Sequence, residues 1–261
     1  MNSRVQLVVG GILAAVLIAV GGYYLYRDAA PVAPAPLAGA PSLEDVSTIT
    51  ELPLPSVDAP RLPMPMPDLG RPFSFGAEFS PEAQSLMREK MAALVANLNA
   101  DPGDFSSWIN LGIRRKAVRD FEGARQAFEY AARLQPENYL PPYNLGVLSH
   151  YFLKDFQNAE RHFLRALDLF PSNAPTYGEL ADLYRYSYKQ DTTAATDILK
   201  RGLAATGDDA NLLVKLAVYY RDVAGDSANA RRYFGEAKDA AEKAGNIKLA
   251  AALAEEITAL K

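Results

Sequence analysis

Residues 105–136 read FSSWINLGIRRKAVRDFEGARQAFEYAARLQP, and this stretch decides the fold. Its landmark residues, in chain order, are Trp108, Leu111, Gly112, Ala124, Phe128, Ala131 and Pro136. Large apolar residues spaced by three or four positions predict two amphipathic helices. The small residues let the two helices approach closely, and the second helix ends near Pro136 because the residue before a proline resists the α conformation. The stretch therefore predicts a helical hairpin.

The same pattern returns three more times, and its two closing prolines, Pro136 and Pro171, are 35 residues apart. The later copies carry, at corresponding positions, Leu145, Gly146, Ala159, Phe163, Ala166 and Pro171; then Leu180, Ala181, Tyr184, Ala195, Leu199 and Gly202; then Leu216, Ala217, Tyr220, Ala230, Phe234 and Ala237. We expect hairpins over residues 105–138, 139–173, 174–209 and 210–243. Copies two to four hold one or two extra residues near the turn within the hairpin.

This repeat resembles the tetratricopeptide repeat (TPR) family, whose signature is W-x2-L-G-x2-Y, then A-x3-F, then P. The resemblance covers roughly residues 105–241, and it implies an all-α fold, a TPR-type α-solenoid of about four hairpins. Arg115 and Ser149 occupy positions where the family prefers tyrosine. Those departures and the extra turn residues leave the turn geometry in doubt. An ordinary helical bundle with chance similarity is the alternative.

A solenoid needs its two ends covered. Ser80 followed by Pro81 is typical of a helix start, and an apolar stripe follows it, so we expect a leading helix over residues 81–98. After Gly245 a second stripe predicts a capping helix over residues 246–260, with Glu255 and Glu256 on its wet face. The helical domain is thus expected to span residues 80–261.

Residues 1–27 form a different kind of segment. No residue from 5 to 26 is charged, and this run of 22 residues would span about 33 Å as a helix, enough for a hydrocarbon core of about 30 Å. We interpret it as a transmembrane anchor; a cleavable signal peptide is the alternative, although its apolar region is normally shorter. Arg4 precedes the run, and Arg27 and Asp28 nearly cancel after it, which favours a cytoplasmic N-terminus and an extracytoplasmic helical domain.

Residues 28–79 hold 11 of the 18 prolines, and seven acidic residues against two basic ones. This composition predicts a disordered Pro- and Ala-rich linker with polyproline II character. We interpret it as a spacer; a docking site for a proline-binding protein is the alternative.

Residues 80–261 carry 23 basic and 24 acidic residues, a balance that argues against a nucleic-acid partner. The chain has no cysteine, so thiolate catalysis and cysteine-ligated metals are excluded. Its two histidines, His150 and His162, fall on different helices of copy two, which does not make a zinc site. No phosphate-binding or dinucleotide-binding motif occurs. We therefore expect no enzymatic activity, no catalytic residues, no cofactor and no metal.

The resemblance implies that the first helix of each copy lines an inner groove that binds a partner. Carried onto this sequence, it assigns to the groove Asn110, Ile113, Lys116, Tyr143, Asn144, Val147, His150, Tyr151, Glu179, Asp182, Arg185, Tyr186, Lys215, Val218 and Arg221. Tyrosine and arginine are common at binding anchors. The alternative is that these positions are simply exposed to solvent and bind no partner.

Taken together, these features predict a membrane-anchored scaffold that binds a peptide or helix of another protein in its groove. The alternative is an assembly factor that presents a client to an extracytoplasmic membrane machine, such as that of cytochrome c maturation, which similar repeat proteins serve. Self-association of the stack stays open.

Overall fold

A computed structural model describes residues 65–190 and 192–260. All described residues belong to one compact unit of the chain. The helical elements in chain order are α2 (Pro81–Ala100), α3 (Phe105–Ala117), α4 (Phe121–Leu134), α5 (Leu140–Leu148), η2 (Ser149–Leu153), α6 (Phe156–Leu169), α7 (Ala174–Tyr186), α8 (Ala194–Thr206), α9 (Ala210–Tyr219), η3 (Tyr220–Ala224), α10 (Ser227–Lys243) and α11 (Ile247–Ala259). These residues form no β-strand, as the sequence predicts.

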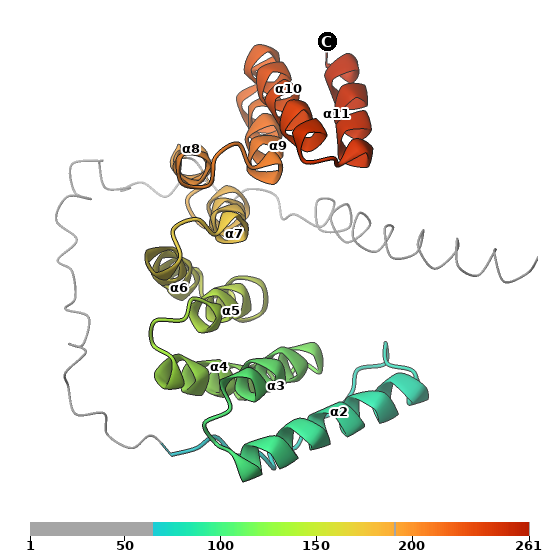
Figure 1. The fold of residues 1–261 in the computed structure, drawn as a ribbon, viewed down its shortest axis with the longest axis vertical. Helices are drawn as coiled ribbons and strands as arrows, with labels where there is room; N and C mark the ends of the chain where they lie inside the picture. Colours follow the sequence, from blue (N-terminus) through green and yellow to red (C-terminus); the bar gives the residue numbers. More distant parts are fainter. Residues whose placement is uncertain (1–64, 191, 261) are drawn as a thin grey trace, which may run out of the picture. The chain divides into compact units, whose positions relative to one another are not determined.

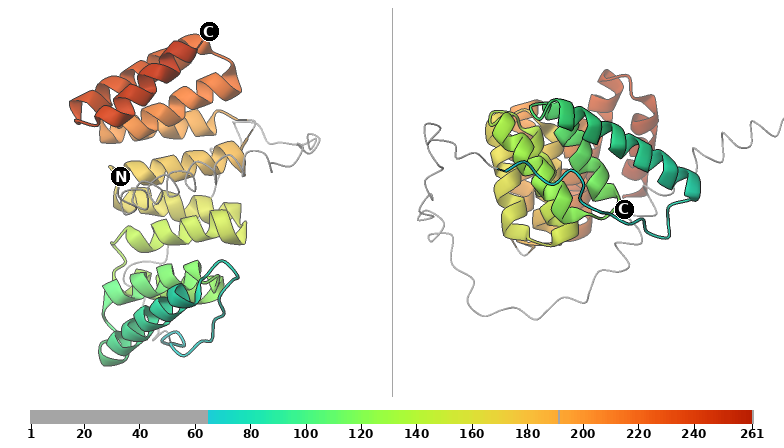
Figure 2. Two further views of the ribbon diagram at one scale, coloured as in Figure 1. Left: turned by 90° about the vertical axis from the view of Figure 1, so that its right-hand side faces the viewer. Right: turned by 90° about the horizontal axis from the view of Figure 1, so that it is seen from below.

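The helices pair into hairpins that stack in chain order. Helix α3 packs on α4, α5 on α6, α7 on α8 and α9 on α10, and each second helix packs on the first helix of the next pair. The pairs form successive layers in Figures 1 and 2. Helix α2 covers α3 at one end and α11 covers α10 at the other. The prediction of a solenoid of stacked helical hairpins is confirmed.

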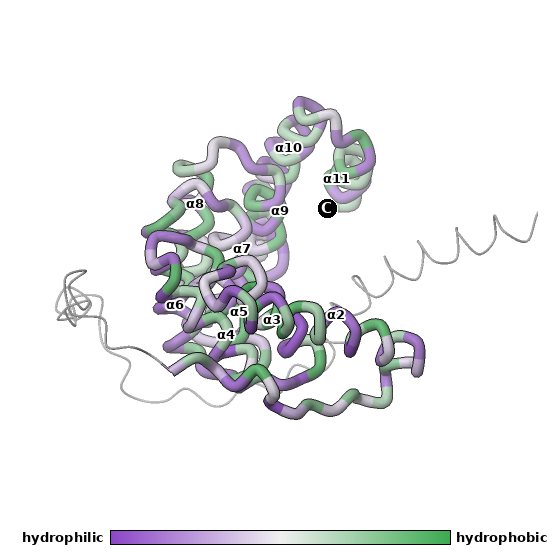
Figure 3. The backbone as a smooth tube through the Cα atoms, turned by 60° about the horizontal axis from the view of Figure 1, so that its bottom comes forward, coloured by the Kyte–Doolittle hydropathy of each residue, from purple (hydrophilic) through white to green (hydrophobic). Residues whose placement is uncertain are grey.

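Small residues in the first helices let aromatic rings of the second helices approach. A methyl group added at Gly112 would lie 2.4 Å from Cε1 of Phe128, and one at Gly146 would lie 2.6 Å from Cδ1 of Phe163. Both rings are fully buried, as is Trp108, whose Nε1–H donates to the carbonyl oxygen of Pro102 at 2.9 Å. Hydrophobic and hydrophilic residues alternate along the helices in Figure 3, as the amphipathic pattern requires. The recurring small and large residues thus set how closely each hairpin closes.

Aspartate and asparagine begin most of the helices. Their side chains accept a hydrogen bond from a backbone N–H two or three residues further on, at Asp104, Asp120, Asp155, Asn173, Asp209, Asp226 and Asn246. Ser80 caps α2 in the same way, as predicted. Each such cap stabilises its helix by about 0.5–2 kcal/mol, so the hairpin boundaries are specified locally.

Two first helices end in a π-helical turn. In η2 the N–H of Asp155 donates to the carbonyl oxygen of Ser149 at 3.0 Å, and Lys154 reverses the chain with φ 57°. In η3 the corresponding reversal falls on Gly225, with φ 64°. A π turn holds one more residue than an α turn. The extra residues of copies two and four are therefore absorbed at the end of the first helix.

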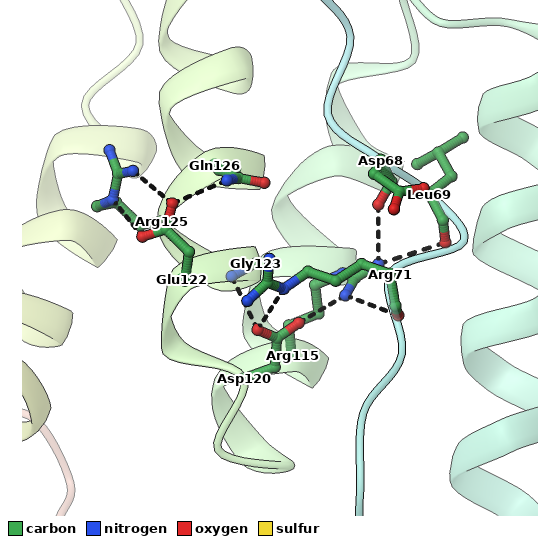
Figure 4. A network of polar contacts seen from close by, with 9 residues as sticks. All are labelled: Asp68, Leu69, Arg71, Arg115, Asp120, Glu122, Gly123, Arg125 and Gln126. Atoms are coloured by element: carbon green, nitrogen blue, oxygen red, sulfur yellow. Dashed lines mark hydrogen bonds and ion pairs between the residues drawn. The ribbon is translucent and has the colours of Figure 1, made fainter.

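Residues 65–79, here called the strap, contact the first hairpin. Arg115 is only 2% exposed, and its guanidinium donates to the backbone oxygens of Asp68, Leu69 and Arg71 at 3.3–3.4 Å and to the Asp120 carboxylate at 2.6 Å. Arg71 reaches the same carboxylate at 2.8 Å (Figure 4). The last part of the segment interpreted as a linker therefore contributes buried contacts to the helical unit.

Within this part of the chain no helix is long and apolar enough to cross a membrane. The anchor predicted at residues 5–26 lies outside the described residues, as do residues 28–64 of the predicted linker.

Candidate functional site

The first helices of the four hairpins, α3, α5, α7 and α9, provide the surface here called the inner face; in Figure 1, α3, α5 and α7 lie on the side opposite α4, α6 and α8. Helix α3 contacts α5, and α7 contacts α9, in addition to the contacts within each hairpin. Neighbouring second helices share no contact of similar extent in the residues that the structure describes. Helices α5 and α7 share no contact of this extent either, so the close approach of first helices is limited to α3 with α5 and α7 with α9.

A polar cluster occupies the middle of the inner face. The Tyr151 hydroxyl donates to Oε2 of Glu179 at 2.8 Å, which joins the second hairpin to the third. Burial raises the pKa of Glu179, and the nearby charge of Asp182 raises it further, against the opposing effect of the Tyr151 hydrogen bond. Burial lowers the pKa of Lys116, and the Glu179 charge opposes that shift. Burial, with the Glu179 charge, also raises the pKa of Tyr143. Lys116, Tyr143 and Glu179 are thus partly dehydrated and lie close enough for their charges to interact.

Ion pairs connect the inner face of the later hairpins. They join Lys215 Nζ to Asp182 Oδ2 at 2.6 Å, Arg185 to Asp222 Oδ2 at 3.3 Å, and Arg221 to Glu256 Oε2 at 2.7 Å. Each pair crosses from one element to a later one in the stack. Their side chains remain partly exposed, so each contributes little to stability, about 0–1 kcal/mol. Their consequence is that the charges of the third and fourth copies largely satisfy one another.

The apolar members of the predicted groove differ in accessibility. Ile113 is 41% exposed, whereas Val147 and Val218 are partly buried against the core. Asn110 is exposed, and its side-chain amide donates to the Ser106 carbonyl oxygen within its own helix. Of these positions, Ile113 is the one that offers a partner substantial apolar surface.

Two residues assigned to the groove are buried in the stack instead. Asn144 is 8% exposed and donates to the carbonyl oxygen of Leu140. His150 is 2% exposed, and its Nε2 lies 3.0 Å from Oγ of Ser187 in the next hairpin. Burial lowers the pKa of His150 to about 4. His150 is therefore not accessible to a partner in this structure, and its ring connects the second hairpin to the third.

Tyr186 is half-buried, and the Arg185 guanidinium lies 4.7 Å from the centre of its ring. His162, expected to be solvated, is also partly buried, and burial lowers its pKa to about 4. Both histidines are therefore neutral near pH 7.

Three further residues belong to this surface and were not predicted. Asp222 and Glu256 supply the carboxylates for Arg185 and Arg221, and Glu256 comes from the capping helix α11. Phe152, 42% exposed, lies with its ring 5.8 Å from Nζ of Lys116. The predicted positions end at Tyr151 in η2 and at Arg221 in η3 and include none from the capping helix, so Phe152, Asp222 and Glu256 were missed. The opposite charges of Arg221 and of the solvent-exposed face of α11 were a usable signal for Glu256.

The described residues do not assemble a recognisable reaction centre. No group of three histidine, aspartate or glutamate side chains among residues 65–190 and 192–260 could hold a metal ion. His150 and Ser187 form a hydrogen bond, but Nδ1 of His150 has no hydrogen-bond partner, so no third group orients the imidazole as in a catalytic triad.

Comparisons with known proteins bear on the fold. No protein-family description matches the chain, and no curated protein matches it. A crystal structure of MamA matches with a TM-score of 0.51 at 19% identity, over 63% of this chain and 94% of MamA. A second MamA structure matches with a TM-score of 0.50 at 19% identity, over 63% of this chain and 88% of its own.

MamA is a TPR protein. The fold is a TPR-type α-solenoid. At this level of identity the likeness to MamA concerns the fold alone. Within a TPR solenoid, the inner face described above is the surface formed by the first helices of the repeats.

Proposed function

We propose that this TPR solenoid is a membrane-anchored protein-interaction scaffold whose inner face holds a segment of another protein. The observation that carries the proposal is the central part of that face, where exposed Ile113 and Tyr151 lie beside the partly dehydrated Lys116 and Glu179. A surface of this kind gains free energy when a partner covers its apolar part and pairs with its half-buried charges.

The binding mechanism would be passive. An extended or helical segment would bury ring and aliphatic surface of the first three hairpins, and the charged side chains would fix its direction and register. The ion pairs of the later copies, such as Lys215 with Asp182, would keep the neighbouring hairpins in place around the bound segment.

The membrane anchor rests on the uncharged run at residues 5–26, and the extracytoplasmic location rests on Arg4 before it. Protease treatment of intact spheroplasts tests this part of the proposal. We expect digestion of the helical unit from outside; protection until the membrane is permeabilised would reverse the orientation.

The binding role is tested with the full-length chain in detergent, using chemical cross-linking and mass spectrometry on solubilised membranes of its source. Replacing Tyr143, Tyr151 and Arg185 together by serine should abolish partner capture while the circular dichroism of the helices stays unchanged. Because Tyr143 also packs against the core, Ile113→Glu provides a second variant that charges the exposed inner face without disturbing packing.

A matched control changes three exposed residues of the second helices, Gln157, Arg161 and Lys200, to serine. We expect this outer-face variant to capture its partner as well as the unaltered chain. If the inner-face variants also retain full capture, the inner face is not the binding surface. If the captured partner is subsequently transferred to a membrane complex, the protein is an assembly factor for that complex.

A further inference from the structure

A patch of large apolar side chains lies beside the inner face, where the first two hairpins turn. It consists of Phe121, Phe152 and Leu153 with the cations Lys116, Arg119 and Lys154, and is here called the turn patch. Phe152 and Leu153 are each 42% exposed, and the Phe152 ring packs on Phe121 with 5.0 Å between centroids. Lys116 places its Nζ 5.8 Å from the Phe152 ring centre, within range of a cation–π contact.

The backbone holds this patch outward through η2. The Asp155 N–H bonds to the Ser149 carbonyl oxygen across the wider turn, and Phe152 and Leu153 lie between those two residues. Lys154 then adopts a left-handed conformation that favours glycine over lysine. π-Helical turns are frequent at functional sites.

The fourth copy provides an internal comparison, because η3 has the same geometry. There Val223 corresponds to Phe152, Ala224 to Leu153 and Gly225 to Lys154. Val223 is 51% exposed but takes no part in an aromatic pair. The geometry of the π turn itself therefore requires neither a phenylalanine nor a lysine at these positions.

The charges around the turn patch are unbalanced. Lys116, Arg119 and Lys154 form no ion pair within 4 Å with any carboxylate that the structure describes. The neighbouring carboxylates are engaged elsewhere: Asp120 with Arg71 and Arg115, Asp155 as the cap of α6, and Glu179 with Tyr151. The patch thus combines exposed apolar surface with three cations, of which Lys116 lies against the Phe152 ring.

We infer that the turn patch binds a partner segment in which apolar side chains alternate with carboxylates. This inference rests on the proposed binding function and names the chemistry of the partner. An aromatic or aliphatic side chain of the segment covers the Phe121–Phe152 pair, and carboxylates on either side meet Lys116 and Lys154. The segment then continues along the inner face past Tyr151 and Ile113, which lies one helical turn before Lys116.

Charge complementarity selects this partner over the alternatives. A basic segment would meet three cations, and a purely polar segment would leave the two rings in water. A carboxylate beside Lys116 also restores to the half-buried ammonium part of the interaction that it loses with water.

The test measures fluorescence anisotropy of synthetic peptides with the full-length chain in zwitterionic nanodiscs, corrected with empty nanodiscs. The probe is a labelled decapeptide that alternates glutamate with leucine and phenylalanine. One comparison peptide has lysine in place of glutamate, and another has serine in place of the apolar residues. The variants are Phe152→Ser with Leu153→Ser, and Lys116→Glu with Lys154→Glu; Val223→Ser in η3 is the matched control.

We expect the acidic apolar peptide to bind at least tenfold more tightly than either comparison peptide. The paired serine variant should lose at least tenfold in affinity, the charge-reversal variant should prefer the lysine peptide, and Val223→Ser should change nothing. Equal binding of the acidic and basic peptides, or affinity that survives both paired variants, would overturn the inference. If that happens while Ile113→Glu still abolishes partner capture, the inner-face function stands; if capture survives every inner-face change, the proposed function fails instead.

Discussion

Replacing Asp120 by alanine should destabilise the first hairpin more than any other single charge removal that we consider. The Asp120 carboxylate accepts hydrogen bonds from buried Arg115 at 2.6 Å, from Arg71 at 2.8 Å and from the Gly123 N–H at the start of α4. Its side chain is 8% exposed and that of Arg115 only 3%. One carboxylate therefore caps a helix, neutralises a buried guanidinium and holds the strap.

The magnitude follows from burial. Removing one partner of a buried ion pair costs about 3–5 kcal/mol, because the remaining charge stays uncompensated. Loss of a capping side chain costs about 1 kcal/mol. Since one group performs both tasks the two effects overlap, and we expect about 4 kcal/mol for Asp120→Ala. Asp120→Asn retains the cap but not the charge, so it should cost about 3 kcal/mol.

An exposed ion pair on the same helix supplies the control. Arg125 lies 2.6 Å from both Glu122 and Glu129, but all three side chains are about 40% exposed. Such pairs contribute less than about 1 kcal/mol, so Arg125→Ala should have only a small effect although its distances match those of Arg115. Burial, and not distance, decides the difference.

The assay is urea unfolding of the full-length chain in detergent, followed by Trp108 emission. Trp108 is the only tryptophan of the chain and lies fully buried in α3, so its red shift reports the first hairpin. Since repeat solenoids do not always unfold in one step, amide exchange of residues 68–71 gives a second, local readout. The reasoning would be refuted by a loss below 1 kcal/mol for Asp120→Ala, or by a loss for Arg125→Ala that equals it.

Two further predictions follow from packing and from titration. Gly112→Ala should destabilise the chain by about 1–3 kcal/mol in urea unfolding, since the new methyl would lie 2.4 Å from Phe128; Gly235→Ala, which meets nothing within 4 Å, should instead stabilise α10 by up to about 1 kcal/mol. Burial lowers the pKa of His150 to about 4, so its contribution to stability is present above about pH 6.5, the ordinary histidine pKa, and is lost as the pH falls toward 4. His150→Gln should flatten the fall in unfolding free energy across this window, leaving the part due to His162, and an unchanged slope would contradict the assignment.

Much of the fold can be predicted because it depends on contacts between neighbours in sequence. Gly112 and Phe128 lie in one hairpin, so their steric fit leaves a short-range pattern that repeats with each copy. The helix predicted over residues 81–98 is α2 (Pro81–Ala100), and the capping helix predicted over 246–260 is α11 (Ile247–Ala259). Helix starts are also local, because Ser80 bonds to the N–H only three residues away.

The contacts of the strap could not be predicted in this way. Arg115 binds carbonyl oxygens of Asp68 and Leu69, and a carbonyl group is present at every position of every sequence. The prolines around these residues predict extended chain, which is correct for the local conformation but says nothing about where that chain lies. An arginine at a position where the family prefers tyrosine was the one sign in the sequence that this position makes unusual polar contacts.

The positions of the inner-face residues could be predicted only in part. The family spacing places Lys116, Tyr143 and Glu179 in one environment, since they precede any irregularity in their own helices. It does not predict that His150 is buried, because that burial depends on how the second hairpin packs on Ser187 of the third. An insertion can be counted in the sequence, but whether it widens the helix or lengthens the loop depends on the hydrogen bond from Asp155 to Ser149.

The distribution of paired charges argues that the two halves of the inner face differ in role. In the third and fourth copies, Asp182, Arg185 and Arg221 are paired with residues of later elements, so a partner would have to break those contacts to use them. In the first two copies, Lys116 and Lys154 take part in no ion pair with a described carboxylate, and Lys116 lies beside the exposed Phe152 ring. A partner therefore gains the most binding free energy, and breaks the fewest existing ion pairs, at the end of the solenoid that the strap also contacts. Affinity should accordingly depend on the first two hairpins, whereas the later ones keep the surface in shape.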